Sequence, residues 1–188
     1  MQFGRVANEH RANYMINKLK VVPKHLIDLV KEQGIKIYCF NEKCYLSYIG
    51  LADKETFKDG RTTDETSCFM PVEKAISVFD CDYFEEINEL GFCTDLHEFG
   101  HALDYSLGAK LGSKYYLSWN NKDILKGWIH DKGLDWYANQ NPHEYFATAF
   151  MAFYEKGLST YKPWSYREHT REELFEKDND MYRIIANL

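Results

Sequence analysis

The sequence of 188 residues lacks any apolar run long enough to cross a membrane. A spanning helix needs about 20 apolar residues, and the longest candidate, residues 146–154, is far shorter. The first twenty residues also lack the apolar core of about 7–15 residues that defines a secretory signal peptide. We therefore expect no membrane partner and no signal peptide in this chain, and we leave its compartment open.

A basic tract is missing as well. Lysine and arginine total 23 against 29 aspartate and glutamate residues, so the formal net charge is −6. Because affinity for nucleic acid comes largely from cations that neutralise phosphates, we expect no nucleic-acid partner. The composition, 45% hydrophobic and 28% charged, is that of a globular protein. The length suits one domain over residues 1–188, which we expect to be a monomer.

Cysteines are few, and their spacing argues against a zinc ribbon because no two stand as C-x-x-C. Their number is odd, so at least one thiol is free unless it pairs with another chain. We expect buried thiols in a reducing compartment, since an odd and irregular set is not a disulfide framework. The five residues are Cys39, Cys44, Cys68, Cys81 and Cys93.

The patterns that are present predict an α+β fold in which strands come early and helices late. Apolar residues at helical spacing indicate the helices, and alternating β-branched and aromatic residues indicate the strands. The expected helices cover residues 7–20, 23–33, 94–107, 122–132, 141–156 and 170–188. The expected strands cover residues 35–40 and 75–79, with 45–49 as a further candidate, and a long polar loop covers residues 51–67.

Within the helix expected at residues 94–107 the sequence reads His-Glu-Phe-Gly-His. Residues four apart lie one turn apart and about 40° around a helix, so the imidazoles of His97 and His101 can reach one ion. Glu98 lies at the edge of that face, where it can hold a water on the ion and accept its proton. Asp104, three residues beyond the pair, either orients a ligating imidazole or is a solvated acid. The pattern predicts a zinc site in a mostly buried helix.

A catalytic zinc takes three protein ligands, so a third must come from elsewhere in the chain. The metzincin extension would need a histidine at position 107, where the sequence has leucine. Glu144, early in the apolar helix expected at residues 141–156, is one candidate, and His143 is the other. Asn141 and Glu144 also form a capping-box pattern, which needs no metal. The residues alone leave these alternatives open.

The runs HEFGHALDY and NPHEYFATAF resemble the catalytic domain of anthrax lethal factor and its smaller relatives, the Pro-Pro endopeptidases. In that family a glutamate on a helix reading E-[FY]-F-A-x-[AS]-F completes the histidine pair, so the resemblance implies that Glu144 is the third ligand. It also implies that Tyr137, seven residues earlier, polarises the carbonyl under attack, and that Asp104 matches an acid of the family. The motifs cover residues 94–150. The earlier part matches only in the order of its elements, and the segment 51–70 has no counterpart.

The resemblance implies a zinc-dependent endopeptidase of the gluzincin type, with one zinc ion per chain and a peptide or protein as substrate. Glu98 is then the general base on the zinc-bound water, and Tyr137 stabilises the oxyanion. The strand expected at residues 75–79 would be an edge strand that pairs with an extended substrate, or alternatively an interior core strand. The substrate and the cleavage site do not follow from the sequence.

Two other functions are weighed against this one. The first is that of the intracellular H-E-x-x-H proteins that cleave prophage repressors, which often place an acidic residue on a later helix. The second is a catalytically silent binding module, although such a module would be free to lose Glu98, which is present.

The remaining aromatic residues and histidines have plainer interpretations. The tryptophans are expected in the core or in a cleft wall, and the histidines outside the motifs at the surface or paired. The tryptophans are Trp119, Trp128, Trp136 and Trp164, and the histidines are His10, His25, His130 and His169.

Overall fold

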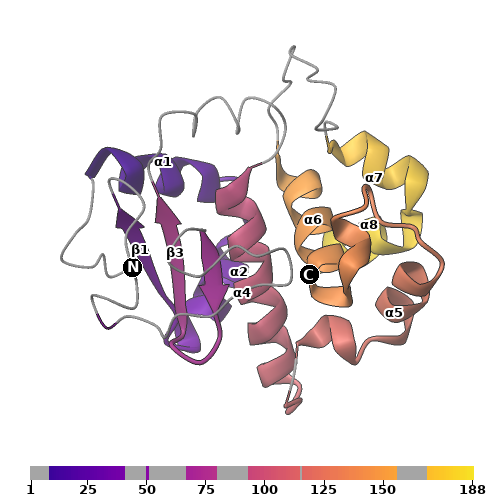
Figure 1. Cartoon of the computed structure of the whole chain (residues 1–188), viewed down its shortest axis with the longest axis horizontal. Coiled ribbons are helices and arrows are strands. Elements are labelled where there is room, and N and C mark those ends of the chain that lie inside the picture. Colours follow the sequence, from indigo (N-terminus) through magenta and orange to yellow (C-terminus); the bar gives the residue numbers. More distant parts are fainter. Residues whose placement is uncertain (1–8, 41–49, 51–66, 80–92, 115, 156–168) are drawn as a thin grey trace.

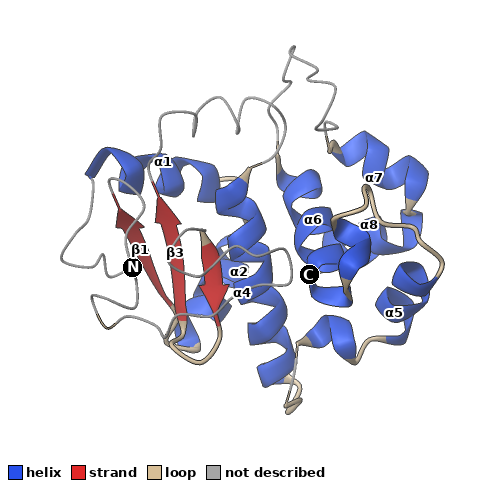
Figure 2. Ribbon diagram, viewed as in Figure 1, coloured by secondary structure: helices blue, strands red, loops and turns tan. Residues whose placement is uncertain are grey.

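The computed structural model describes residues 9–40, 50, 67–79, 93–114, 116–155 and 169–188. A small sheet lies on one side of a long helix, α4 (Thr94–Lys110), and a group of helices lies on the other side (Figure 1). The described residues are mainly helical with one sheet (Figure 2), so the predicted α+β class is confirmed. The candidate strand at residues 45–49 and nearly all of the loop expected at 51–67 lie outside the described residues.

The sheet has the strand order β1–β3–β2, formed by β1 (Lys36–Phe40), β2 (Cys68–Met70) and β3 (Ala75–Phe79). β1 runs parallel to β3, and β2 runs antiparallel to it. All five residues of β3 are buried, and this strand pairs with a neighbour on both sides. The expectation of an edge strand at residues 75–79 is therefore wrong, and the interior strand is correct. β2 was not predicted, since it directly follows the segment interpreted as a polar loop.

Two helices precede the sheet: α1 (Glu9–Leu19) and α2 (Lys24–Glu32). Gly34 follows α2 with φ at 77°, a left-handed conformation that glycine adopts without a Cβ penalty and that ends the helix as expected. Arg11 of α1 ties the sheet to α4, because its Nε donates to the Phe79 carbonyl and its Nη2 lies 2.6 Å from Asp95 Oδ1. Both side chains of this ion pair are fully buried, which fixes the first turn of α4 against α1.

α4 packs against α6 (Pro142–Tyr154) at the centre of the molecule. The two helices approach closely at Gly100, where an added Cβ would lie 3.0 Å from the Ala147 Cα atom. Fully buried Phe99 and Phe150 pack together between them, with ring centroids 5.9 Å apart. α5 (Lys122–Ile129) and two short 3-10 helices, η1 (Leu117–Trp119) and η2 (Ala138–Gln140), lie against this pair.

The chain ends in two helices, α7 (Arg171–Lys177) and α8 (Asn179–Ala186), that pack on α6. The single helix expected at residues 170–188 is therefore wrong. The break lies at Asp178, whose backbone has φ −142° and ψ 79° and whose side chain accepts a hydrogen bond from the Met181 N–H. An aspartate at an N-cap position satisfies an otherwise unpaired donor of the new helix, so it starts α8 instead of continuing α7.

Three of the five cysteines, Cys39, Cys68 and Cys93, lie in the described residues, and all three are buried. Burial raises the pKa of Cys39 to about 11, so its thiol stays protonated near neutral pH. Cys44 and Cys81 fall outside the described residues. Over the part of the chain that the structure describes, every helix is too short or too polar to traverse a bilayer.

Candidate metal centre

The two histidines of the H-E-x-x-H motif lie in the first half of α4 and face each other across one helical turn. Their Nε2 atoms are 3.1 Å apart, and both side chains are buried. A buried imidazole needs a partner for its ring nitrogens, because an unsatisfied polar group in the interior is costly. The pair His97 and His101 therefore presents two nitrogen atoms to one point.

Glu144 reaches the same point from the first turn of α6. Its Oε2 atom lies 3.0 Å from His97 Nε2 and 3.3 Å from His101 Nε2. Burial acts to raise the pKa of Glu144, but the two imidazoles, His101 foremost, overcome it and hold that pKa below its ordinary value. One ligand atom from each of the three residues lies within 4.8 Å of the others, an arrangement that can hold a metal ion.

The donor atoms fit zinc, because two imidazole nitrogens and one carboxylate oxygen form a set that catalytic zinc sites use. The geometry fits as well, since the carboxylate oxygen lies near both nitrogens. Three ligands leave a fourth tetrahedral position for water or substrate.

The start of α6 directs Glu144 to this point. The Asn141 side chain accepts a hydrogen bond from the Glu144 N–H at 2.9 Å, and Pro142 occupies the first helical position, as its fixed φ favours. This is half of the expected capping box. The other half would turn the glutamate back toward the cap, whereas its carboxylate points to the histidines.

His143, the other candidate ligand, has different partners. Its Nδ1 accepts a hydrogen bond from the indole N–H of Trp119 at 3.2 Å, and its ring stacks on Tyr116 with centroids 5.1 Å apart. Burial and the neighbouring His101 lower the pKa of His143 to about 4. Among the described residues, the group of converging ligand atoms includes Glu144 and does not include His143.

The side chain of Glu98 is hydrogen-bonded to the backbone of the sheet. Its Oε2 accepts a hydrogen bond from the backbone N–H of Phe69, in the middle of β2, at 2.8 Å. The carboxylate is mostly buried beside the two histidines of its own helix. The unpredicted strand therefore orients the acid next to the two histidines. Residues 68–70 are three apolar residues in a row, too few for a periodic pattern to indicate the strand in the sequence.

Tyr137 lies at the start of η2, with its ring centroid 5.8 Å from that of His97. The turn that carries it is anchored by Asp135, whose Oδ1 accepts the Ala138 N–H at 2.7 Å and whose Oδ2 lies 2.8 Å from His169 Nε2. His169 lies just before α7 and is buried. Of the two expectations for this histidine, surface or paired, the second is therefore met. That this pair supports the tyrosine turn was not predicted, since its members are 34 residues apart.

Asp104 does not orient a ligating imidazole by any hydrogen bond in the described structure. Its Oδ1 accepts the Ser118 N–H at 2.8 Å and its Oδ2 accepts the Ser118 hydroxyl at 2.6 Å. Burial raises the pKa of this carboxyl to about 7, and Ser118 acts in the opposite direction. The alternative of a solvated acid is also wrong, because the side chain is fully buried. Asp104 fixes η1 to α4 instead.

Comparison with protein-family models matches residues 5–188 to the model described as "Anthrax toxin lethal factor, N- and C-terminal domain". The chain belongs to the anthrax toxin lethal factor family. The resemblance stated from the two sequence runs is thereby confirmed. Comparison with curated proteins finds no match.

Among solved structures, the Pro-Pro endopeptidase PPEP-2 from Paenibacillus alvei is similar to this lethal factor family member. The TM-score is 0.66 at 18% sequence identity, and the match covers 99% of this chain and 95% of the other. At this identity the likeness establishes the shared fold. Family membership and this neighbour together support a peptidase-type function.

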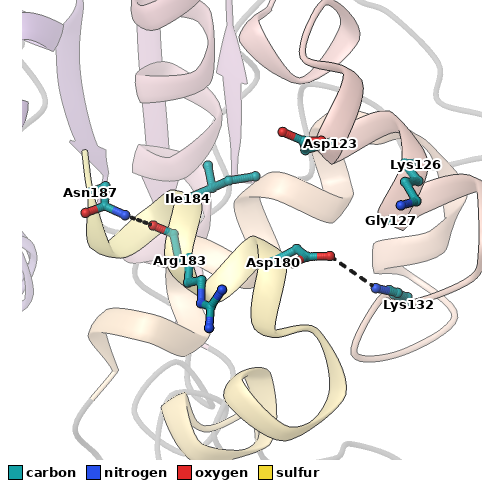
Figure 3. A pocket seen from close by; sticks show the side chains of 8 residues that line it. All are labelled: Asp123, Lys126, Gly127, Lys132, Asp180, Arg183, Ile184 and Asn187. Carbon is teal, nitrogen blue, oxygen red and sulfur yellow. Dashed lines mark hydrogen bonds and ion pairs between the residues drawn. The ribbon is translucent and has the colours of Figure 1, made fainter.

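Away from the candidate metal centre, a hollow of about 540 Å³ lies between α5 and α8 (Figure 3). Basic and acidic side chains line it, and Lys132 pairs with Asp180 across it at 3.6 Å. The residues that line it include none of the predicted site residues of this lethal factor family member. The chemistry expected from the sequence is therefore concentrated at the α4–α6 contact.

Proposed function

We propose that this chain is a zinc-dependent endopeptidase of the gluzincin type that hydrolyses peptide bonds in a peptide or protein. The observation that carries the proposal is the convergence of His97, His101 and Glu144, from two different helices, on one point. Its support is the donor set, which suits zinc, and the peptidase-type function to which the family and the fold neighbour point. Zinc bound there would acidify a water molecule and polarise the scissile carbonyl.

Glu98 supplies the proton transfer in this proposal. Its carboxylate takes a proton from the water that attacks the carbonyl carbon, and a new carbon–oxygen bond forms. It then delivers that proton to the leaving amine nitrogen as the carbon–nitrogen bond breaks. The hydrogen bond from the Phe69 N–H supports this role, because it fixes one oxygen of the carboxylate beside the ligands.

Tyr137 supplies the hydrogen bond to the oxyanion that develops on the carbonyl. Its ring lies beside His97, and the Asp135 anchor preorganises the turn that carries it. A donor held in place before the reaction stabilises developing charge without reorganising, which is why such groups lower the barrier.

The test begins with the purified full chain, its bound metal measured by elemental analysis and its cleavage of a random peptide library followed by mass spectrometry. The library includes Pro-Pro bonds, because the fold neighbour is named a Pro-Pro endopeptidase. We expect one zinc per chain and specific cleavage that a chelator abolishes. A chain that binds zinc and cleaves nothing would instead be a silent binding module, and selective cleavage of repressor proteins would favour the prophage-type peptidase.

Two conservative variants separate the roles of the residues. Glu98→Gln is expected to keep its zinc and lose nearly all turnover, because the amide cannot accept the proton. Tyr137→Phe is expected to keep its zinc and KM while kcat falls by about 10²–10³, the range for loss of one oxyanion donor. Near-normal turnover in Glu98→Gln would contradict the general-base role, and loss of zinc in Tyr137→Phe would contradict the oxyanion role.

A further inference from the structure

Two exposed tryptophans lie close to the metal centre, and each is connected by side-chain contacts to a different histidine of α4. Trp136 is 75% exposed and Trp119 is 44% exposed, although indole rings are usually largely buried. Exposed apolar groups that gather at a site mark a surface for another molecule, whereas single scattered ones need no explanation. The described chain also exposes Val72, Leu111, Ile129 and Phe175.

Trp136 connects to the centre through Tyr137. The two rings meet edge to face with centroids 5.8 Å apart, and the Tyr137 ring lies 5.8 Å from His97. The backbone around Trp136 is held in place, because the preceding Asp135 bonds both to His169 and to the Ala138 N–H. The indole is therefore exposed on a rigid turn.

Trp119 connects to the centre through His143. Its indole N–H donates to His143 Nδ1, and the His143 ring lies 5.4 Å from that of His101. The backbone beneath Trp119 is also held, because the preceding Ser118 donates two hydrogen bonds to buried Asp104. Rigid aromatic surfaces bind well, because little side-chain freedom is lost when a ligand covers them.

We propose that Trp136 and Trp119 are two separate subsites that bind apolar side chains of the substrate on either side of the bond to be cut. This proposal rests on the proposed endopeptidase function. The contacts of the two indoles lead to different histidines of α4. A peptide bound at the centre would therefore place different residues of its sequence against the two rings. The substrate class is therefore a peptide with apolar, preferably ring-bearing, residues near the cut.

The neighbours of the two indoles favour apolar side chains over charged ones. The rings that contact Trp119 are those of Trp128 and His143, and the ring that contacts Trp136 is that of Tyr137. A flat apolar side chain covers such a surface without losing charge hydration, and offset or edge-to-face ring contacts add to the area buried. A lysine or arginine would gain only a cation–π contact at these exposed rings.

The test uses blocked peptide libraries in which one position at a time is fixed as Phe, Leu, Pro, Ala or Lys. For the zinc-loaded wild type we expect preference for the apolar residues at two positions. Trp136→Ala should abolish the preference at one position and Trp119→Ala at the other, each lowering kcat/KM about ten-fold through KM, as apolar subsite contacts do. Trp136→Phe and Trp119→Phe should retain most of the preference for apolar residues. The matched control is Phe175→Ala, an exposed aromatic on α7, far from α4 (Figure 1).

Peptide binding to zinc-loaded Glu98→Gln, followed by tryptophan fluorescence, separates this inference from the proposed function. If the wild type cleaves nothing while apolar peptides bind in a way that both tryptophan-to-alanine variants weaken, the peptidase function fails and the two subsites stand. If the wild type cleaves but the variants leave the profile unchanged, or lysine is preferred at both positions, the inference is overturned. An equal effect of Phe175→Ala would overturn it as well.

Discussion

The close approach of α4 and α6 at Gly100 makes the metal centre sensitive to a single methyl group. In Gly100→Ala, the new Cβ would lie 3.0 Å from Ala147 Cα, 3.3 Å from its carbonyl oxygen and 3.4 Å from its Cβ. Unstrained carbon–carbon contacts are about 3.5–4.0 Å, so the helices must separate by several tenths of an ångström. The two nearest atoms are backbone, so no side-chain rotation can relieve the contact.

The expected change in the free energy of unfolding combines two opposing effects. Alanine is a better helix former than glycine by about 1 kcal/mol, whereas overpacking a tight contact costs about 1–3 kcal/mol. The net result for the metal-free chain is a loss of at most about 2 kcal/mol. Zinc affinity should fall more distinctly, because the histidines and Glu144 lie on opposite sides of this contact and zinc–ligand distances tolerate only about ±0.2 Å.

The assay measures both quantities on the same preparations. Urea unfolding of the chelator-treated chain gives the free energy, and competition with a coloured chelator gives the zinc affinity, for which we expect a loss of about ten-fold or more. The double variant Gly100→Ala with Ala147→Gly is the control. It removes only the 3.4 Å contact, so it should not restore zinc affinity. Increased stability with unchanged affinity in Gly100→Ala would refute the reasoning.

The remaining predictions concern the third ligand and the His169 pair. Glu144→Ala should lose most of its zinc in elemental analysis while His143→Ala keeps it, and the opposite pattern would show that the ligand is misassigned. Burial lowers the pKa of His169, but Asp135 and then Glu173 outweigh it, so the folded pKa lies above 6.5. The pair's contribution to the free energy of unfolding should therefore be complete below pH 6.5 and lost as the pH rises through the folded pKa of His169. In urea unfolding from pH 6 to 9, His169→Gln should flatten this decline in the free energy of unfolding. Because the pKa of Asp135 is lowered from 3.8, the stabilisation that its carboxylate contributes is lost only below pH 3.8. If the free energy of unfolding of His169→Gln declined with the same slope from pH 6 to 9, the pair would be excluded as the cause of the decline.

Local patterns predicted the helices that carry the metal centre. The i, i+4 spacing of His97 and His101 specifies a shared helix face whatever packs against it. Asn141 followed by Pro142 specifies a helix start from the chemistry of the first turn alone. The choice of Glu144 over His143 needed the family resemblance, because both lie in that first turn and only tertiary packing decides which side chain faces α4.

The sequence patterns could not predict contacts between residues that lie far apart in the chain. An apolar run at residues 75–79 fits an interior or an edge strand equally. The paired residues that decide between them lie 39 positions earlier in β1 and directly before the run in β2. A strand as short as β2 carries too few residues for a periodic signal. The partner of Asp104 was equally hidden, because a buried carboxylate and a solvated one look alike in sequence.

The placement of Glu144 in the first turn of α6 also bears on how a metal would enter and leave. Helix ends fray at far lower free energy than packed helix interiors. His97 also lies in a first turn, that of α4, but the fully buried ion pair of Arg11 and Asp95 holds this turn, and His101 lies one turn further in. Opening one turn at Asn141 and Pro142 would release the carboxylate while the imidazole pair stayed fixed. Exchange of a metal held by these residues would then follow the local opening of one helix end, and hydrogen exchange at the Glu144 amide would report it directly.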